Sequence, residues 1–347
     1  MNKPRYFVGI DIAAATFTSA IGEMGEKWQL TVKATPFDNT FDSFPKYLAW
    51  LQAHGVRPEN AILCMEATGV YNEVLAHFLV ANHYGVAIEP PLKVKRAFTP
   101  EGHKSDAVDC GQISEYAYRF WDELSLWAPR QAVLEQIKTL LATREQFVAE
   151  KAGHQHALLA LQRKAIRTPL AEQLHATAIA QLKAHIRQTE AEIQRLIDQD
   201  PPAHHTVALL MTIPGVGLLL AAHLLITFQN APQPLSPKDL AAFVGICPYE
   251  NSSGTSLLHT PTSRHYGPPG LRKLLFLAAL SLRTHNPSFR TYFQRKKDAG
   301  KPAKLVINNI ANKLLKIVVA VVRTDTAFIP GYRSINPRLL KPALTKS

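Results

Sequence analysis

The sequence of 347 residues has little cysteine and no long uncharged apolar stretch. Its three cysteines form no CxxC pair, which excludes a disulfide scaffold and argues against a thiolate zinc site. The longest apolar runs, 216–228 and 317–322, are shorter than the roughly 18–20 residues that a bilayer-spanning helix requires, so we expect no membrane span. Asp11 interrupts the N-terminus before a signal-peptide core could form, which predicts a cytoplasmic protein.

Positive charge is abundant and unevenly distributed. The chain carries a net charge of +12, and the residues after 263 contain 17 Lys and Arg against two acids, a net +15 that leaves −3 for the rest. Such asymmetry is typical of a face that binds nucleic acid, because each neutralised phosphate releases counterions. A solvated basic surface and a patch for anionic lipid are the alternatives. The candidate phosphate contacts are Arg264, Arg272, Lys273, Arg283, Arg290, Arg295, Lys296 and Lys297.

The first ~120 residues have the pattern of a mixed α/β domain. Short apolar, β-branched segments predict strands at Tyr6–Asp11, Thr16–Ile21, Gln29–Ala34, Ala61–Met65 and Val86–Glu89. Helical spacing of apolar residues predicts helices over Phe41–Leu51, Asn72–Asn82 and Ala107–Tyr118.

From about residue 129 the pattern becomes helical. Apolar residues at three- and four-residue steps predict a long hairpin or coiled coil that bends at Thr168-Pro169 and ends at Asp200-Pro201-Pro202. A second globular part, mostly helical, is expected from about 206 to 325, with loops at 230–237 and 248–270 and a tail thereafter.

Four carboxylates lie where they could converge. Asp11 and Glu66 end predicted strands, and Asp106 and Asp109 share one face of a predicted helix. Because converging carboxylates repel one another, their convergence would imply Mg²⁺ or Mn²⁺, and two such ions ~4 Å apart suit displacement at a phosphodiester. The order of elements matches a ribonuclease H-like nuclease core. The alternatives are a turn residue, a helix N-cap and a solvated surface acid.

Histidine, glycine and serine give further candidates. The histidines at 154–156 and 204–205 lack acids at ligand spacing and are more simply exposed. The turn Ile213–Gly217, with Gly215 and Gly217, resembles a helix-hairpin-helix turn that brings backbone amides to phosphate, or is only a tight turn. The hydroxyl-rich segment 251–256 could supply a nucleophile or be an ordinary surface loop.

Several motifs together resemble one family. Val8-Gly9-Ile10-Asp11, the segment 64–71 around Glu66, and Lys104-Ser105-Asp106-Ala107-Val108-Asp109 resemble the acidic motifs of DEDD-type insertion-sequence transposases, which are relatives of the pilin-gene invertase and the bridge-RNA-guided recombinases. Segments 213–217, 243–248, 253–254 and 271–275 resemble that family's C-terminal transposase domain, in the same order.

The resemblance implies a RuvC-like domain over 1–125 in which Asp11, Glu66, Asp106 and Asp109 hold Mg²⁺ or Mn²⁺. It further implies a coiled-coil oligomerisation segment over 126–202, a C-terminal transposase domain over 203–325 and a tail over 326–347. Ser253, the serine that precedes glycine beside Ser252, would attack DNA and form a phosphoserine link. Lys104 would join the nucleic-acid contacts.

The same resemblance implies the partners. Target and donor duplexes would be selected by a structured guide RNA that the element encodes, the protein would be a dimer or tetramer, and the acidic domain and the serine would come from different protomers. A bacterial, nucleoid-associated location follows. Alternatives that the residues leave open are an Mg²⁺-dependent junction resolvase in which water attacks, and a non-catalytic nucleic-acid-binding protein; an actin-like ATPase lacks the expected phosphate loops.

Overall fold

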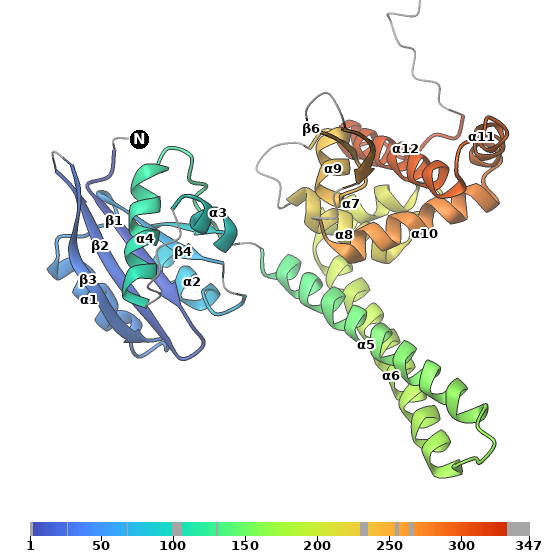
Figure 1. The fold of residues 1–347 in the computed structure, drawn as a ribbon, viewed down its shortest axis with the longest axis horizontal. Helices are drawn as coiled ribbons and strands as arrows, with labels where there is room; N and C mark the ends of the chain where they lie inside the picture. Colours follow the sequence, from blue (N-terminus) through green and yellow to red (C-terminus); the bar gives the residue numbers. More distant parts are fainter. Residues whose placement is uncertain are drawn as a thin grey trace, which may run out of the picture. The chain divides into compact units, whose positions relative to one another are not determined.

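A computed structural model describes residues 3–25, 27–67, 69–98, 106–129, 131–229, 235–253, 257–263 and 267–331. The chain divides into two compact units, residues 1–130 and 131–347, each considered by itself below. The expected segment 126–202 is thus divided between them, and its helical hairpin belongs to the second unit (Figure 1).

Unit 1 is a mixed sheet with helices on both faces (Figure 1). Its elements are β1 (Tyr6–Ile12), β2 (Thr16–Met24), β3 (Trp28–Asp38), α1 (Phe44–Ala53), β4 (Ala61–Glu66), α2 (Glu73–Ala81), β5 (Gly85–Glu89), α3 (Pro91–Arg96) and α4 (Asp106–Arg119). The strand order is β3-β2-β1-β4-β5, with β1 antiparallel to β2 and parallel to β4. All strands begin near their predicted positions; α3 was not predicted, because its six residues are too few to show a helical period.

Successive side chains of a strand point to opposite faces of the sheet, and in unit 1 each face carries its own hydrophobic core. Val8, Ile10 and Met65 join the core on the side of α1 and α2. Phe7, Cys64 and residues of α4 form the core on the other side. Because β1 is apolar toward both faces, it is the central strand, and the polar residue at its end, Asp11, is only partly buried.

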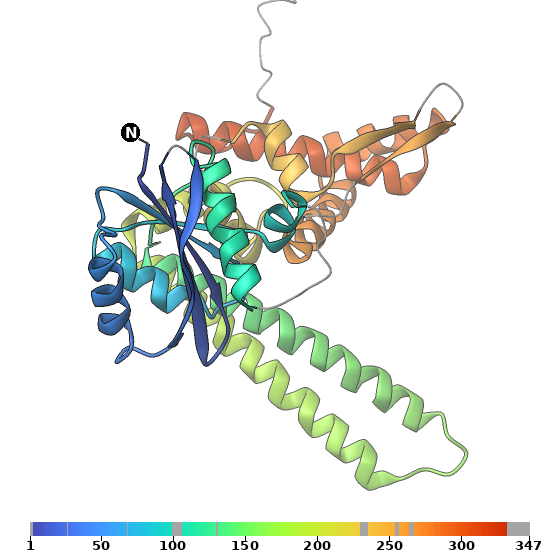
Figure 2. The same cartoon turned by 60° about the vertical axis from the view of Figure 1, so that its left-hand side comes forward.

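Unit 2 begins with an antiparallel helical hairpin, as the sequence predicts (Figure 2). α5 (Ala132–Gln162) and α6 (Pro169–Gln199) are joined across the expected bend at Thr168. Arg144 of α5 and Glu190 of α6 form an ion pair with an N–O distance of 2.7 Å. Nearer the tip, Nδ1 of His154 lies 2.8 Å from Nδ1 of His175, so this histidine of the 154–156 group packs against the partner helix.

The rest of unit 2 is a helical body with one β-hairpin. Its elements are α7 (Pro201–Met211), α8 (Leu218–Gln229), α9 (Pro237–Val244), β6 (Pro248–Ser253), β7 (Leu257–Ser263), α10 (Pro269–His285), α11 (Pro287–Asp298) and α12 (Ala303–Thr324). Its core includes apolar residues from α5 to α10 and α12, with residues of α11 packed against its edge. The expected mostly helical part is present in this region.

The predicted loop at 248–270 was wrong over much of its length, because β6 and β7 pair there as an antiparallel hairpin. Two prolines obscured the signal: Pro248 begins β6, and Pro261 lies at an irregularity in the pairing between Tyr249 and Asn251. Both strands of a two-stranded hairpin are edge strands, where a missing backbone donor is tolerated.

One helix, α12, is long and apolar enough to cross a membrane, although the sequence analysis expected no span. Half of its most apolar window is buried inside unit 2. Val306, Ile310 and Leu314 recur on the buried face, while Lys313 and Lys316 are exposed. This amphipathic pattern is that of a core helix in a protein body.

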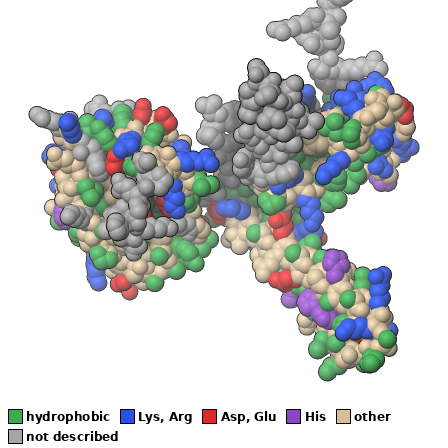
Figure 3. All heavy atoms as spheres, in the orientation of Figure 1, with side chains coloured by type: hydrophobic (Ala, Val, Ile, Leu, Met, Phe, Trp, Pro, Cys, Tyr) green, Lys and Arg blue, Asp and Glu red, His purple; other side chains and the backbone are tan. Residues whose placement is uncertain are grey.

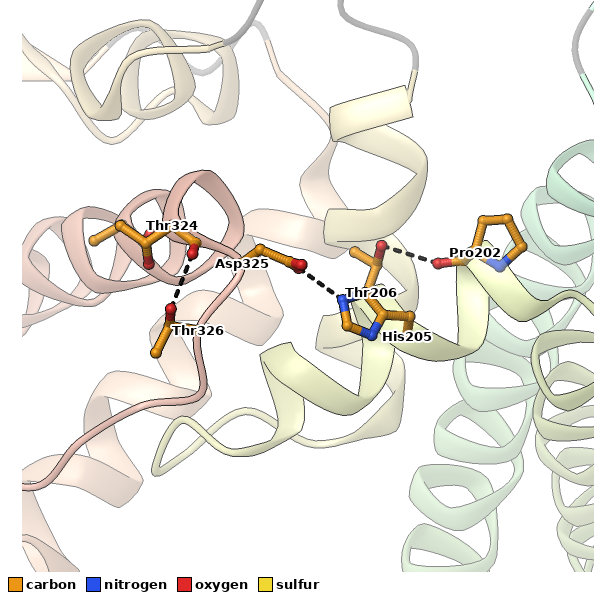
Figure 4. Close-up of polar contacts among 7 residues, drawn as sticks. Pro202, His205, Thr206, Thr324, Asp325 and Thr326 are labelled. Carbon is orange, nitrogen blue, oxygen red and sulfur yellow. Dashed lines mark hydrogen bonds and ion pairs between the residues drawn. The ribbon is translucent and has the colours of Figure 1, made fainter.

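Polar contacts fix the chain where α12 ends (Figure 4). Asp325 adopts a left-handed conformation with φ of 50°, and its Oδ1 lies 2.6 Å from Nε2 of His205 in α7. The Thr326 hydroxyl donates to the carbonyl of Thr324 at 2.9 Å. His205, expected as an exposed histidine, is exposed and connects two helices that are far apart in sequence.

His223 makes the stability of unit 2 depend on pH. Burial chiefly, and the charge of Arg144 secondarily, lower the pKa of His223 to about 4, while Glu145 Oε1 lies 3.6 Å from its Nε2 and acts in the opposite direction. In the unfolded chain the imidazole takes up its proton near pH 6.5. The free energy of unfolding is therefore highest above that pH, and it falls by up to about 3 kcal/mol as the pH drops toward 4.

We expect His223→Gln to flatten that pH dependence. Thermal unfolding of the full chain between pH 7.5 and 4.5 measures it, with His156→Gln on the exposed surface of α5 as the control. Identical curves for wild type and His223→Gln would show that the buried imidazole does not set the acid limit.

Candidate functional site: carboxylates at the sheet edge and cations on the helical body

Asp11 and Glu66 lie on neighbouring parallel strands at the same edge of the sheet. Gly9 pairs with Cys64 and Ile10 with Met65, so Asp11 and Glu66 follow at the carboxyl ends of β1 and β4. Alternation places them on the face of Phe7 and Cys64, which α4 covers. The two acids that the sequence singled out on strands are therefore brought together.

Helix α4 packs on this face by direct backbone contact. A Cβ added at Gly9 would lie 2.0 Å from the Cys110 carbonyl oxygen and 2.4 Å from the Ser114 amide nitrogen. The Ser114 hydroxyl donates to the carbonyl of Phe7 at 2.7 Å. Only glycine permits this approach, and it brings the first half of α4, which contains Asp109, against β1.

The charges of Asp11 and Asp109 affect the pKa of the Cys110 thiol. Burial chiefly, then the charge of Asp11 and to a smaller extent that of Asp109, raise the pKa of Cys110 to about 11. The raised pKa keeps the thiol neutral at pH 7 when no cation is bound. Cys64 is also buried, and burial raises the pKa of its thiol, as expected for cysteines that act as small apolar residues.

Glu89 is a carboxylate that the sequence analysis did not single out. It pairs in register with Glu66 at the end of β5, and it is buried. Lys93, in the first turns of α3, lies 2.9 Å from Glu89 Oε2, and this hydrogen bond raises the pKa of Lys93. The sequence did contain a signal for this pair, namely an acid at a strand end followed by a lysine four residues later. The ion pair with Lys93 compensates the negative charge of Glu89 beside the other acids.

The donor set suits a hard divalent cation. Asp11, Glu66 and Asp109 supply only carboxylate oxygens, which Mg²⁺ and Mn²⁺ prefer. Among the side chains that the structure describes, no three acids, histidines or cysteines are close enough to hold a metal ion. Asp106 begins α4, and its side chain lies outside the described residues.

The predicted nucleophile belongs to the β6–β7 hairpin. Ser253 ends β6 and pairs with Leu257, while Ser252 pairs with Leu258; the side chains of both serines lie outside the described residues. The segment that leads into β6 is held by side chains of the helical body. Asn308 and Asn312 of α12 donate to the Ile246 carbonyl at 3.0 and 3.4 Å, and Arg272 donates to that of Val244 at 3.2 Å.

The glycine turn joins α7 and α8, as predicted. Gly215 has φ of 84°, and a Cβ there would lie 3.1 Å from Leu282 Cγ and 3.3 Å from the Ala278 carbonyl oxygen of α10. This glycine therefore allows a tight turn to pack on α10. A Cβ at Gly217 would meet nothing within 4 Å, so that position remains open to a phosphate.

The candidate phosphate contacts differ in their surroundings. Arg272 and Arg290 are engaged within the fold, the latter with the Thr284 carbonyl, and Arg283 lies over the ring of Phe293 at 4.9 Å. Arg295 and Lys296 lie around the ring of Tyr292. Lys273 and Lys297 are exposed. Lys104 and Arg264 lie outside the described residues. Lys and Arg side chains gather at the end of the body where α11 lies (Figure 3).

Comparisons with known proteins match both units. The profile of the "Transposase IS116/IS110/IS902 family" matches residues 207–294, and a second transposase profile, of the DEDD type, matches residues 8–165. The pilin gene-inverting protein of Moraxella bovis is 30% identical over 93% of this chain and 97% of its own length. That of Moraxella lacunata is 29% identical over the same shares. An insertion element IS110 protein of Streptomyces coelicolor is 29% identical over 44% of this chain and 36% of its own length.

These matches define a DNA transposase or recombinase, an enzyme that binds and rearranges DNA. More particularly, the chain belongs to the IS110 family of DEDD transposases, the family of the pilin gene-inverting proteins. The predicted family is confirmed. DEDD transposases typically use a divalent metal ion.

Proposed function

We propose that this transposase recombines DNA with carboxylate-bound Mg²⁺ or Mn²⁺, a serine nucleophile and an element-encoded guide RNA. The observation that carries the proposal is the pairing of β1 with β4, which brings Asp11 and Glu66 to one edge under α4. An arrangement of strand-end acids with an acid-bearing helix supports a ribonuclease H-like, RuvC-like role for unit 1.

Asp11, Glu66, Asp106 and Asp109 would hold the metal. When bound, the cation stabilises negative charge on phosphodiester oxygens. The carboxylates orient it, and the backbone contact at Gly9 fixes the distance between the acids of the sheet and those of α4. Gly9 is thus a positioning residue for this cluster.

Ser253 would carry out the covalent step. Its Oγ forms a bond to phosphorus, one P–O bond of the DNA breaks, and the leaving sugar oxygen takes up a proton and becomes a hydroxyl. The serine hydroxyl gives up its proton, so one phosphodiester replaces another and no external energy source is needed. Asn308, Asn312 and Arg272, which hold the approach to β6, support this role by anchoring the hairpin.

The partners follow from charge and family. The net +15 after residue 263 suits both DNA and a structured guide RNA, and the exposed face of the α5–α6 hairpin suits self-association into a dimer or tetramer. The enzyme would act on DNA in the bacterial nucleoid.

A denaturing gel tests the covalent step. Purified protein, Mg²⁺, RNA transcribed from the flanking non-coding DNA of its own element, and labelled target and donor duplexes are incubated together. We expect a labelled protein–DNA band that survives denaturation with wild type and with Ser252→Ala, and no such band with Ser253→Ala. DNA cut without any adduct would replace the serine mechanism with resolvase-like attack by water.

Complementation tests whether acids and serine act from different protomers. Asp11→Asn and Ser253→Ala proteins, each inactive alone, are mixed before DNA is added. We expect the mixture to recover a fraction of the wild-type adduct, because an oligomer that contains both variants retains an intact acid cluster and an intact serine. No recovery, with mixed oligomers demonstrated by affinity tags, would place both functions in one protomer.

A further inference from the structure

A depression between α11 and α12 is lined by cationic side chains and, among the described residues, by no carboxylate. It has a volume of about 480 Å³ and is lined, in the described part of the chain, by Ser288, Phe289, Thr291, Tyr292, Arg295, Lys313, Lys316 and Ile317. Lys313 and Lys316 come from the exposed face of α12, outside every motif that the sequence analysis considered. Three positively charged side chains and three hydroxyl-bearing side chains, Ser288, Thr291 and Tyr292, therefore line one concave surface.

The ring of Tyr292 is the centre of this cluster. Lys313 Nζ lies 4.8 Å from the ring centroid, Arg295 Cζ 5.9 Å and Lys296 Nζ 6.0 Å. Each cation is attracted by the aromatic face, but cations gathered around one ring also repel one another. An anion in the depression would relieve that repulsion, and the hydroxyl of Ser288 would donate to its oxygens, whereas the Thr291 hydroxyl already donates to the Pro287 carbonyl at 3.0 Å.

A second cavity continues from the first along α12. Its volume is about 920 Å³, and it shares Ser288, Lys316 and Ile317 with the cationic depression. Its far part is largely apolar: Ala320, Val321, Ala327, Phe328 and Ile329 line it together with Thr324, Thr326 and Gly331. His205 holds the segment that forms this wall through its contact with Asp325.

We propose that this α11–α12 groove binds an unpaired nucleic-acid strand, with the phosphodiester backbone at Arg295, Lys313 and Lys316 and the bases toward the apolar part. An unpaired strand fits because it can present phosphates and exposed base faces together, whereas the base faces of a duplex are stacked inside it. The inference deepens the proposed function and rests on it for the presence of nucleic acid; unpaired RNA and unpaired DNA share this chemistry.

Binding of short labelled strands in EDTA tests the groove without catalysis. The probes are oligouridylate and oligothymidylate of about 16 nucleotides and a duplex of the same length, measured by fluorescence anisotropy at several salt concentrations. We expect Arg295→Ala/Lys313→Ala/Lys316→Ala to weaken strand binding about 10-fold or more and to lower the slope of log K against log salt by about 2. A preference for oligouridylate or for oligothymidylate shows whether the groove selects RNA or DNA. Equal binding shows that the groove recognises the phosphate backbone that both strands share.

A matched variant separates the groove from general electrostatics. Lys164→Ala/Lys183→Ala/Arg187→Ala removes the same charge from exposed positions of the hairpin, and we expect it to weaken strand binding less than about 3-fold. Tyr292→Leu, which keeps an apolar group at the core edge, is expected to weaken strand binding more than duplex binding. Circular dichroism confirms that each variant is folded.

The inference would be overturned if the groove triple variant (Arg295, Lys313 and Lys316 to Ala) and the hairpin triple variant (Lys164, Lys183 and Arg187 to Ala) lost the same strand affinity. It would also be overturned if the groove triple variant lost strand and duplex affinity equally. Because strand binding is measured without metal or cleavage, its result is independent of the denaturing gel that detects the protein–DNA adduct. A chain that binds strands through the groove but forms no adduct contradicts the proposed chemistry alone. Adduct formation with unchanged strand binding in the groove triple variant contradicts the groove alone.

Discussion

Asp11→Asn is expected to lower DNA cleavage by at least about 10²-fold while the protein remains folded. The substitution keeps the size of the side chain and removes the charge that would hold a divalent cation opposite Glu66. Loss of one preorganised electrostatic group at a reacting phosphate commonly costs that much. Stability in EDTA should be unchanged or higher, because one member of a like-charged cluster has been neutralised.

The metal dependence of stability gives a second measurement. A ligand that binds only the folded state raises the unfolding temperature, so Mg²⁺ or Mn²⁺ should stabilise wild type and leave Asp11→Asn almost unaffected. Asp122→Asn, at an exposed position of unit 1, is the control for charge removal. Wild-type cleavage by Asp11→Asn would mean that Asp11 is structural and that cleavage does not depend on a metal ion held by this carboxylate.

Gly9→Ala is expected to destabilise unit 1 by about 3 kcal/mol or more and to abolish cleavage. The new methyl group would lie 2.0 Å from the Cys110 carbonyl oxygen, a backbone atom that cannot rotate away, so α4 must move off β1. Overpacking of a buried contact typically costs about 1–3 kcal/mol, and a displaced helix also loses the Ser114 hydrogen bond to Phe7.

Two measurements distinguish displacement from unfolding. Urea unfolding gives the loss of stability, and hydrogen exchange shows whether protection is lost first in α4. Gly25→Ala is the matched control, because its Cβ would meet only the Lys27 carbonyl oxygen, at 3.8 Å. An alanine variant with wild-type stability would show that α4 can occupy another position without cost.

The strand-end acids were predictable because each local signal agreed with the fold. Asp11 follows a strand that is apolar on both faces, and Glu66 ends a run of buried residues, so periodicity alone placed both at strand ends. The helix with Asp109 was also predictable. The parallel register that makes Asp11 and Glu66 neighbours depends on contacts between segments about fifty residues apart, which no local pattern contains.

Other features lacked a local signal. Strands β6 and β7 stabilise one another by pairing, and their serines, asparagine and prolines individually favour loops. Lys313 and Lys316 appear in the sequence as the polar face of an amphipathic helix, and only the packing of α11 on α12 brings them to Tyr292. The assignments of Ser253 as nucleophile and of the four acids as metal ligands stay predictions.

Neighbouring residues of α5 make contacts with different partners in unit 2. Arg144 pairs with Glu190 of α6, whereas Glu145 lies so close to the first turn of α10 that a Cβ at Gly270 would be 1.7 Å from its carboxylate. A carboxylate is favourable at that positive end of a helix. The contact of Glu145 with α10 therefore helps to fix the direction in which the α5–α6 hairpin leaves the helical body of unit 2.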